Sequence, residues 1–334
     1  MNNFRFFKNI LASWILLSGS FCVAQMVAGT VHNGTTGKLS AGDDVKLLRL
    51  DNGMQEESHT KTNGRGSFKL DLQSAGSHYM VRVFHQGVSY DRTVIANVPL
   101  DMTVFDSDSK INDIAGMLSI FQIQSDEQTV RVKEMHAIDN NSSPPKSQNK
   151  PNNFETFLPP DAEIDSVTAK SPDGKPVNIS ATPVQGEAGH YTVDFPLRPG
   201  ETQFVLRYHL PHREKVTFRP RLPYATKSLE IMYPLSMQFV ALEPGRFIFQ
   251  SDPNRQGQII REIKAGEPLA FTVSGIGTLV SSERGKTVLA PSGESAQKKS
   301  SGILWFVLAA ALALLAAGLF LAWRIEAAKQ QRKP

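Results

Sequence analysis

The uncharged run ILWFVLAAALALLAAGLFLAW, residues 303–323, constrains this chain more than any other feature of its sequence. As an α-helix its 21 residues would extend about 32 Å, and the hydrocarbon core of a bilayer is about 30 Å thick. Trp305 and Trp323 lie near its two ends, where amphipathic rings prefer the membrane interface. The alternative, a buried soluble helix, would need protein on every face. We therefore predict one C-terminal transmembrane helix at 303–323.

The N-terminus has the three parts of a secretory signal peptide. Arg5 and Lys8 are basic, residues 10–17 are apolar, and Ala24 ends a site suited to cleavage. An uncleaved anchor is the alternative, but the apolar run is about half of the 20 or so residues that a span needs. We predict a signal peptide at 1–24, which would export the mature N-terminus.

The charged tail gives the orientation of the span. Residues 324–334 carry four basic residues, Arg324, Lys329, Arg332 and Lys333, so the positive-inside rule predicts a cytoplasmic C-terminus. Residues 281–302 are polar and rich in Ser and Gly, which predicts a flexible stalk. We expect a single-pass protein of the bacterial inner (cytoplasmic) membrane, with its N-terminal domains outside the cytoplasm.

Charge and cysteine content restrict the exported part. Of the chain's 36 basic and 32 acidic residues, 30 and 31 remain once the signal peptide and tail are set aside. A near-neutral exported part offers no basic patch for nucleic acid. The one cysteine, Cys22, lies in the signal peptide, so the exported domains must be stable without disulfides.

Residues 26–105 predict a small β-sandwich of short strands. Val81 and Val83 share one face of their segment while Arg82 points to the other, and Gly-containing turns separate the segments. The expected strands are 26–31, 45–50, 56–60, 67–72, 79–85, 88–94 and 100–105.

The stretch TKTNGRGSFKLDL, residues 60–72, predicts a turn between two strands. Asn63 to Gly66 would reverse the chain, after which Phe68 and Leu70 alternate into the core. Arg65 between the glycines could contact an anion, but a solvated turn explains it as well.

The segments AGTVHN, GDDVKLLRL, TKTNGRGSFKLDL and SHYMVRVFHQGVSY together resemble the carboxypeptidase regulatory-like domain, a prealbumin-like seven-stranded β-sandwich. The resemblance covers about 80 residues. It implies an appendage used for adhesion, folding or binding, and it carries no catalytic residues onto this chain.

Residues 114–278 predict a second β-sandwich region, as one unit or as two with a seam near Pro211. The segments 117–124 and 129–139 alternate clearly, and 190–195 with 203–209 are expected to form a hairpin around a Pro199-Gly200 turn. Residues 140–153 contain three prolines and are expected to form neither a helix nor a paired strand. The remaining expected strands are 215–219, 228–233, 237–241, 247–250, 259–263 and 269–273.

The whole exported chain also resembles a group of uncharacterised, membrane-anchored bacterial proteins that carry the regulatory-like domain. The segments NSSPPKSQ and FPLRPGETQFVLRYHLP carry this second resemblance. It implies architecture and location, and no activity.

Few residues suggest chemistry. Asp106, Asp108 and Asp113 are weak candidates to hold calcium in the joint between the domains, and without a Gly turn or a fourth acidic ligand a solvated linker is the favoured interpretation. No histidine is followed three residues later by glutamate, so the zinc-peptidase spacing is absent from the sequence. His209 and His212 flank a proline and make a poor metal pair.

Serine chemistry is equally weak in the sequence. The Ser-x-x-Lys spacings at Ser107, Ser143 and Ser295 fall in expected loops or in the stalk, where the amine is not aligned with the hydroxyl. We expect no catalytic residues and no cofactor.

Three functions remain open. The first is a non-catalytic binding or interaction module of the cell envelope, contacting a partner protein or a glycan. The second is an envelope hydrolase or its accessory subunit, because two carboxylates can meet across a sheet unseen in sequence. The third is a sensor subunit that signals through a partner membrane protein. Oligomers could form through Ala309, Ala313 and Ala317 of the span.

Overall fold

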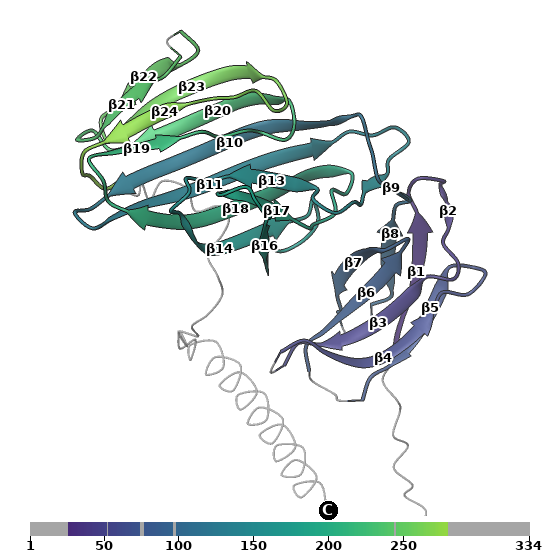
Figure 1. Ribbon diagram of the computed structural model, residues 1–334. Helices are drawn as coiled ribbons and strands as arrows, with labels where there is room; N and C mark the ends of the chain where they lie inside the picture. Colours follow the sequence, from purple (N-terminus) through teal and green to yellow (C-terminus); the bar gives the residue numbers. More distant parts are fainter. Residues whose placement is uncertain (1–25, 52, 74–76, 96–97, 244, 280–334) are drawn as a thin grey trace, which may run out of the picture. The chain divides into compact units, whose positions relative to one another are not determined.

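The computed structural model describes residues 26–51, 53–73, 77–95, 98–243 and 245–279 (Figure 1). Every regular element in these ranges is a β-strand, which confirms the predicted all-β class with several sheets. No described residue belongs to a helix long and apolar enough to cross a membrane. The predicted signal peptide (1–24), stalk (281–302), span (303–323) and tail (324–334) lie outside the described residues.

The first region consists of two four-stranded sheets. One contains β1 (Met26–Asn33), β2 (Lys38–Leu39), β5 (Ser67–Asp71) and β8 (Leu100–Val104), with β8 parallel to β1. The other runs in the order β4 (Gln55–Lys61), β3 (Asp44–Arg49), β6 (Tyr79–His85), β7 (Val88–Thr93), all antiparallel. All seven strands expected in this region are present, within a few residues of their predicted ends.

The two sheets share one apolar core, so they pack as two layers. Val81 and Val83 of β6 are fully buried, and Phe68 and Leu70 of β5 enter the same core from the other sheet. Gly29 of β1 is required there, since a Cβ would lie 2.5 Å from the Phe68 ring and 2.4 Å from the carbonyl oxygen of Leu100. Alternation of apolar and polar residues thus produces one buried face per sheet.

The Asn63–Gly66 turn has the predicted structural role. The side-chain oxygen of Asn63 accepts the backbone N–H groups of Arg65 and Ser67, at 2.9 and 3.1 Å. Gly66 has a φ of +65° and a backbone too close to the Val31 carbonyl for any side chain. Arg65 is exposed and contacts no described acidic group.

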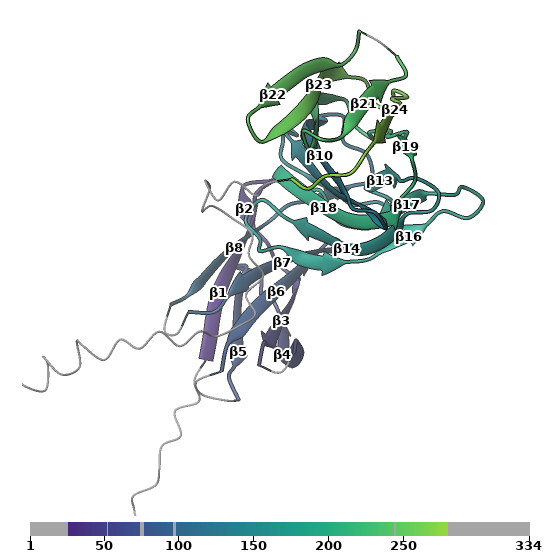
Figure 2. The same cartoon turned by 90° about the vertical axis from the view of Figure 1, so that its left-hand side faces the viewer.

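The second region is built on one eight-stranded sheet (Figures 1 and 2). Its order is β15 (Val177–Ile179), β14 (Glu163–Lys170), β18 (Gly200–Pro211), β11 (Thr129–Asn140), β10 (Ile114–Ser125), β20 (Thr226–Tyr233), β23 (Arg255–Ile263), β22 (Ile248–Asp252). Strands from both sides of Pro211 share this sheet.

Two three-stranded sheets cover one face of the large sheet. The first contains β13 (Phe154–Phe157), β17 (His190–Val193) and β16 (Ala181–Pro183), and the second β19 (Lys215–Phe218), β24 (Phe271–Ser274) and β21 (Gln238–Ala241). Phe154 stacks on Phe204 of β18 with ring centroids 4.5 Å apart, and Phe239 of β21 stacks on Tyr233 of β20 at 5.8 Å. We call this covered side the inner face and the opposite side the outer face.

Two local predictions were wrong. The expected hairpin of 190–195 with 203–209 does not form, because β17 pairs with β13 and β16 while β18 pairs with β11 and β14. Pro196 and Pro199 lack the N–H groups that a continuous ladder needs, so the chain crosses between sheets instead. Segment 140–153 does contain a paired strand, β12 (Ser147–Gln148), which lies parallel to β9 (Ser107–Asp108), since no proline interrupts that dipeptide.

Candidate functional site

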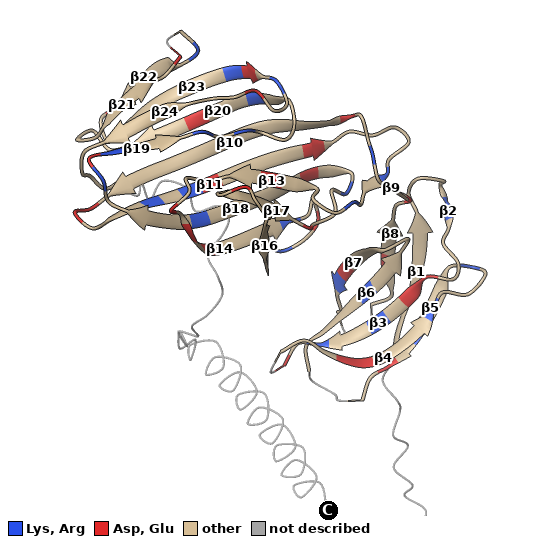
Figure 3. Cartoon of the chain, viewed as in Figure 1, with Lys and Arg blue, Asp and Glu red and all other residues tan. Residues whose placement is uncertain are grey.

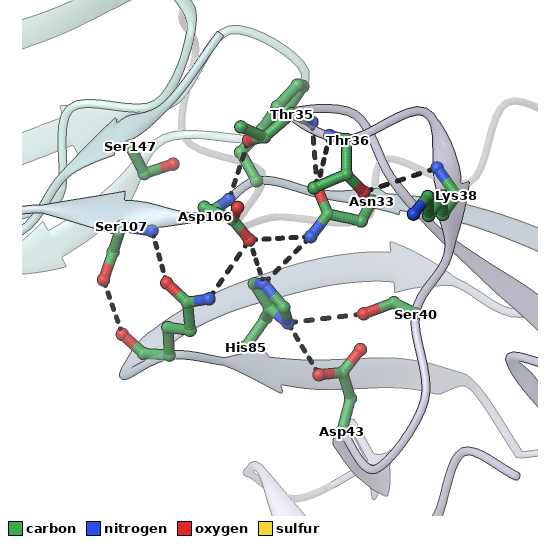
Figure 4. A network of polar contacts seen from close by, with 12 residues as sticks. Asn33, Thr35, Thr36, Lys38, Ser40, Asp43, His85, Asp106, Ser107 and Ser147 are labelled. Atoms are coloured by element: carbon green, nitrogen blue, oxygen red, sulfur yellow. Dashed lines mark hydrogen bonds and ion pairs between the residues drawn. The ribbon is translucent and has the colours of Figure 1, made fainter. Parts of the chain in front are cut away.

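A polar network surrounds His85, at the end of β6 (Figure 4). His85 Nδ1 donates to Asp43 Oδ1 at 2.7 Å, and Nε2 donates to Asp106 Oδ1 at 3.0 Å. Asn33 Nδ2 also donates to Asp106 Oδ1, at 2.7 Å, as does Gln86 Nε2 at 3.1 Å. Both ring nitrogens therefore face carboxylate acceptors, which is the arrangement of a protonated imidazole.

The charges in this network stabilise one another. Burial alone would lower the pKa of His85, but the hydrogen bonds and charges of Asp43 and Asp106 outweigh it and raise the pKa above its usual value. The His85 hydrogen bond, followed by the one from Asn33, lowers the pKa of Asp106. The network is thus a buried ion cluster that holds the ends of β1, β6 and β8 together.

The same network continues into segment 142–149. Thr35 Oγ1 donates to the Pro145 carbonyl at 2.5 Å and accepts from the Asp106 N–H at 2.9 Å. Tyr90 shares a hydrogen bond of 2.9 Å with Ser147 Oγ. These contacts accompany the pairing of β9 with β12 in the joint where the sequence favoured a solvated linker over a calcium site.

Arg198 is a buried cation without a carboxylate partner among the described residues. Its guanidinium donates to Ser171 Oγ at 2.5 Å and to the Ser89 carbonyl, and it lies 5.2 Å from the Tyr90 ring centre. Burial lowers its pKa. Its contacts are carbonyl, hydroxyl and ring, so it connects elements, while its buried Nε has no hydrogen-bond partner among the described residues.

The three calcium candidates are not brought together around one point. Asp106 faces His85, Asp108 Oδ2 accepts from Lys146 Nζ at 3.4 Å, and the Asp113 carbonyl accepts the Asn141 N–H. Within the described ranges, no three His, Cys, Asp or Glu side chains are grouped to hold a metal ion. Calcium binding at this joint stays a prediction.

The other residues singled out in the sequence have separate partners. His209 Nδ1 lies 2.7 Å from Asp165, whereas His212 Nδ1 lies 2.9 Å from Ser125 Oγ, so the two histidines do not converge. Ser107 Oγ donates to the Gln86 carbonyl at 2.9 Å. Ser295 lies outside the described residues.

A second polar cluster lies in the core of the second region. Ser119 Oγ is 2.9 Å from His136 Nδ1, and His136 Nε2 donates to Glu134 Oε2 at 3.2 Å. Tyr208 donates to Glu134 Oε1 at 2.7 Å. We call these four residues the relay cluster, since serine, histidine and carboxylate follow the order of an acyl-transfer triad.

Burial argues for a structural role of the relay cluster. Ser119, His136 and Glu134 expose only 3%, 4% and 1% of their surfaces. The His136 ring lies against Phe154, with centroids 5.0 Å apart. A substrate carbonyl has no route to the Ser119 hydroxyl in this arrangement. The hydrogen bonds of the cluster instead satisfy its buried polar groups, as a structural role requires.

The outer face of the large sheet carries a row of aligned apolar residues. The strand registers place Val205 beside Met135, Met135 beside Ile120, and, beyond Glu230, Ile259 beside Ile248. We call this row the outer stripe. It takes one residue from each of seven neighbouring strands, in the order Thr168, Val205, Met135, Ile120, Glu230, Ile259 and Ile248. At about 4.8 Å per strand it is about 29 Å long.

The outer stripe departs from the usual pattern of an antiparallel sheet, in which the face opposite the core is polar. Val205 and Ile259 are buried by their neighbours on the sheet, yet neither belongs to a core cluster. At the stripe's end, on edge strand β22, Ile248 exposes 52% of its surface. A shallow hollow of about 100 Å³ lies beside Gly257, where the sheet lacks a side chain.

No family model and no curated protein matches this chain. Among solved structures, an M1 zinc metallopeptidase from Deinococcus radiodurans is similar, with 11% identity and a TM-score of 0.29. A variant of that enzyme bound to a Tyr-Ser-Ala substrate has 12% sequence identity to this chain and a TM-score of 0.29. A two-domain M1 zinc metallopeptidase variant bound to L-tryptophan has 10% identity and a TM-score of 0.30.

Each match covers 49% of this chain, and the chain spans 43% of the length of these structures. The likeness is too slight to support an argument about fold or activity.

Proposed function

We propose that this chain is a non-catalytic binding module of the bacterial cell envelope, anchored in the inner membrane by a single span. The signal peptide, the polar stalk, the uncharged run at 303–323 and the basic tail support this topology. The folded regions would lie outside the cytoplasm, with the C-terminus inside. The N-terminal sandwich would be a prealbumin-like, carboxypeptidase regulatory-like appendage, followed by a second sandwich region.

The outer stripe is the observation that carries the binding role. An aligned, mostly apolar row on a sheet face that no described strand covers is typical of a surface that receives a partner. Five of its seven members are apolar, which favours a partner protein over a glycan. Its length of about 29 Å suits a surface of ordinary interface size.

Site-specific photocrosslinking in intact cells tests this function. A photoreactive residue at Thr168 lies in the outer stripe, and one at Thr217 lies on the separate sheet that contains β19. We expect a reproducible crosslinked partner from position 168 and none of the same mass from position 217. Equal products at both positions, or none at either, would contradict the proposal.

The relay cluster favours a second candidate, an envelope hydrolase or an accessory subunit of one. Its residues have the order of a catalytic triad, with the two ring nitrogens of His136 exchanged, so an opening of the core would expose a serine hydroxyl beside a histidine. A serine-reactive fluorophosphonate probe distinguishes the two functions. Labelling that disappears in Ser119→Ala would favour the hydrolase, and an unlabelled protein would favour the binding module.

A further inference from the structure

A row next to the outer stripe contains two cations that face each other. Lys133 of β11 lies directly opposite Arg207 of β18, and Gln122 and Ser166 flank them in the same row. Lys133 is half-buried and Arg207 is exposed. Both residues point to the outer face, because Val132, Glu134, Leu206 and Tyr208 on either side of them point to the core.

Neither cation has a hydrogen bond or ion pair with any described residue. Two neighbouring basic residues on these strands already have acidic partners. Arg131 pairs with Asp126 at 2.6 Å, and His209 pairs with Asp165 at 2.7 Å. Figure 3 shows Lys and Arg in blue on β11 and β18. The pair therefore differs from Arg131 and His209 on the same two strands, each of which has a carboxylate within reach.

Like charges directly opposite on one face of a sheet destabilise it. Burial, and then the charge of Arg207, lowers the pKa of Lys133, so the two cations disfavour each other in the free protein. A bound anion would remove this repulsion. The Arg207 guanidinium can donate hydrogen bonds to two oxygens at once, and the Lys133 ammonium supplies a further donor. The group that fits between these two side chains is therefore an oxyanion.

We propose that Lys133 and Arg207 form a binding site for an oxyanion, a carboxylate or phosphate group, on the ligand that occupies the outer stripe. The apolar members Val205 and Met135 lie in the adjacent row of the same two strands. The ligand would present its acidic group beside an apolar group, about 7 Å away along the strand. This inference rests on the proposed function, since it names the ligand chemistry of that same face.

Isothermal titration of the full chain in detergent micelles tests the site, with sodium phosphate in one arm and sodium succinate in the other. Lys133→Gln and Arg207→Gln should each weaken binding at least tenfold, whereas Lys215→Gln on β19 should leave it unchanged. Binding confined to one arm identifies the kind of oxyanion. Equal binding by all variants, or no saturable binding of either anion by the wild type, overturns the proposal.

Thermal unfolding without added anion gives an independent readout. Lys133→Gln should leave the melting temperature unchanged or raise it, because it removes a repulsion, and phosphate or succinate should then no longer raise it. A lower melting temperature in Lys133→Gln would assign the lysine a structural role and contradict the site.

The two proposals fail separately. Loss of anion binding with crosslinking from Thr168 intact would reject the oxyanion site and keep the stripe. Anion binding without a crosslinked partner would keep the cation pair as a small-ligand site and reject the proposed partner surface.

Discussion

The two described regions place a histidine beside carboxylates in opposite settings. In the first region His85 lies at a sheet end between Asp43 and Asp106. In the second, His136 lies in mid-strand, between Ser119 and Glu134, against the ring of Phe154. At the sheet end, the charged contacts of His85 with its two carboxylates hold strand ends together. In the core it satisfies polar groups that the packed sheets enclose.

This contrast separates polar clusters that hold the fold from surfaces that are free to bind. Both histidine clusters form their hydrogen bonds with other groups of the protein. Lys133 and Arg207 on the outer face form none with the described residues. The proposed binding role therefore rests on the uncovered sheet face, although the buried clusters resemble active sites more closely in residue type.

Removing the carboxylate of the relay cluster should give the largest loss of stability. Glu134→Ala leaves His136 and Tyr208 without their buried acceptor, which should cost about 3–5 kcal/mol. Urea unfolding of the full chain in detergent measures this free energy. Glu230→Ala, on the half-exposed outer face, is the control and should stay within about 0.5 kcal/mol of the wild type. A Glu134→Ala loss no larger than the control's would contradict a structural relay.

Gly29→Ala should disturb the first region and leave the second intact. The added methyl would overlap the Phe68 ring and the Leu100 carbonyl, at a cost of about 1–3 kcal/mol. Gly64→Ala is a matched control, because a Cβ there meets nothing within 4 Å. Hydrogen exchange measured by mass spectrometry should show faster exchange in β1 and β5 only in Gly29→Ala. Unchanged exchange would mean that the Phe68 ring does not pack over Gly29 as described.

The His85 network should make the stability of the first region depend on pH. The folded pKa of His85 is raised, so its stabilisation is complete below the unfolded pKa of about 6.5 and is lost as the pH rises through the folded pKa. The pKa of Asp106 is lowered, so its contribution is present above the unfolded pKa of about 3.9 and is lost as the pH falls through the folded value.

Urea unfolding at pH about 6 and about 9 tests this dependence on the alkaline side. The wild type should be less stable at the higher pH, and His85→Gln should lose that difference. An equal slope in both proteins would assign the titration to another group.

Much of the strand content follows from the sequence, because period-two alternation needs only local residues. Val81 and Val83 indicated a buried face of β6, and the alternating segment at 129–139 indicated β11. Strand partners do not follow, since alternation does not encode them. The parallel pairing of β10 with β20 and the separation of β17 from β18 depend on which apolar faces share a core.

The sites were harder to predict, because their members are distant in sequence. His85 is 42 residues from Asp43 and 21 from Asp106, and Glu134 is 74 from Tyr208. One signal was present: Glu134 and His136 occupy buried positions of an otherwise apolar alternation. The outer stripe and the Lys133–Arg207 pair appear only once the registers of neighbouring strands are known.

Crosslinking from Thr168 in three backgrounds tests the central claim. The claim is that the outer face binds a partner protein and that the relay cluster has only a structural role. The backgrounds are the wild type, Ser119→Ala and Met135→Asp, each first shown to unfold cooperatively and to reach the same level in the membrane. We predict an unchanged yield in Ser119→Ala and a lost product in Met135→Asp, which places a charge in the stripe. A product that survives Met135→Asp but disappears in Ser119→Ala would contradict the account.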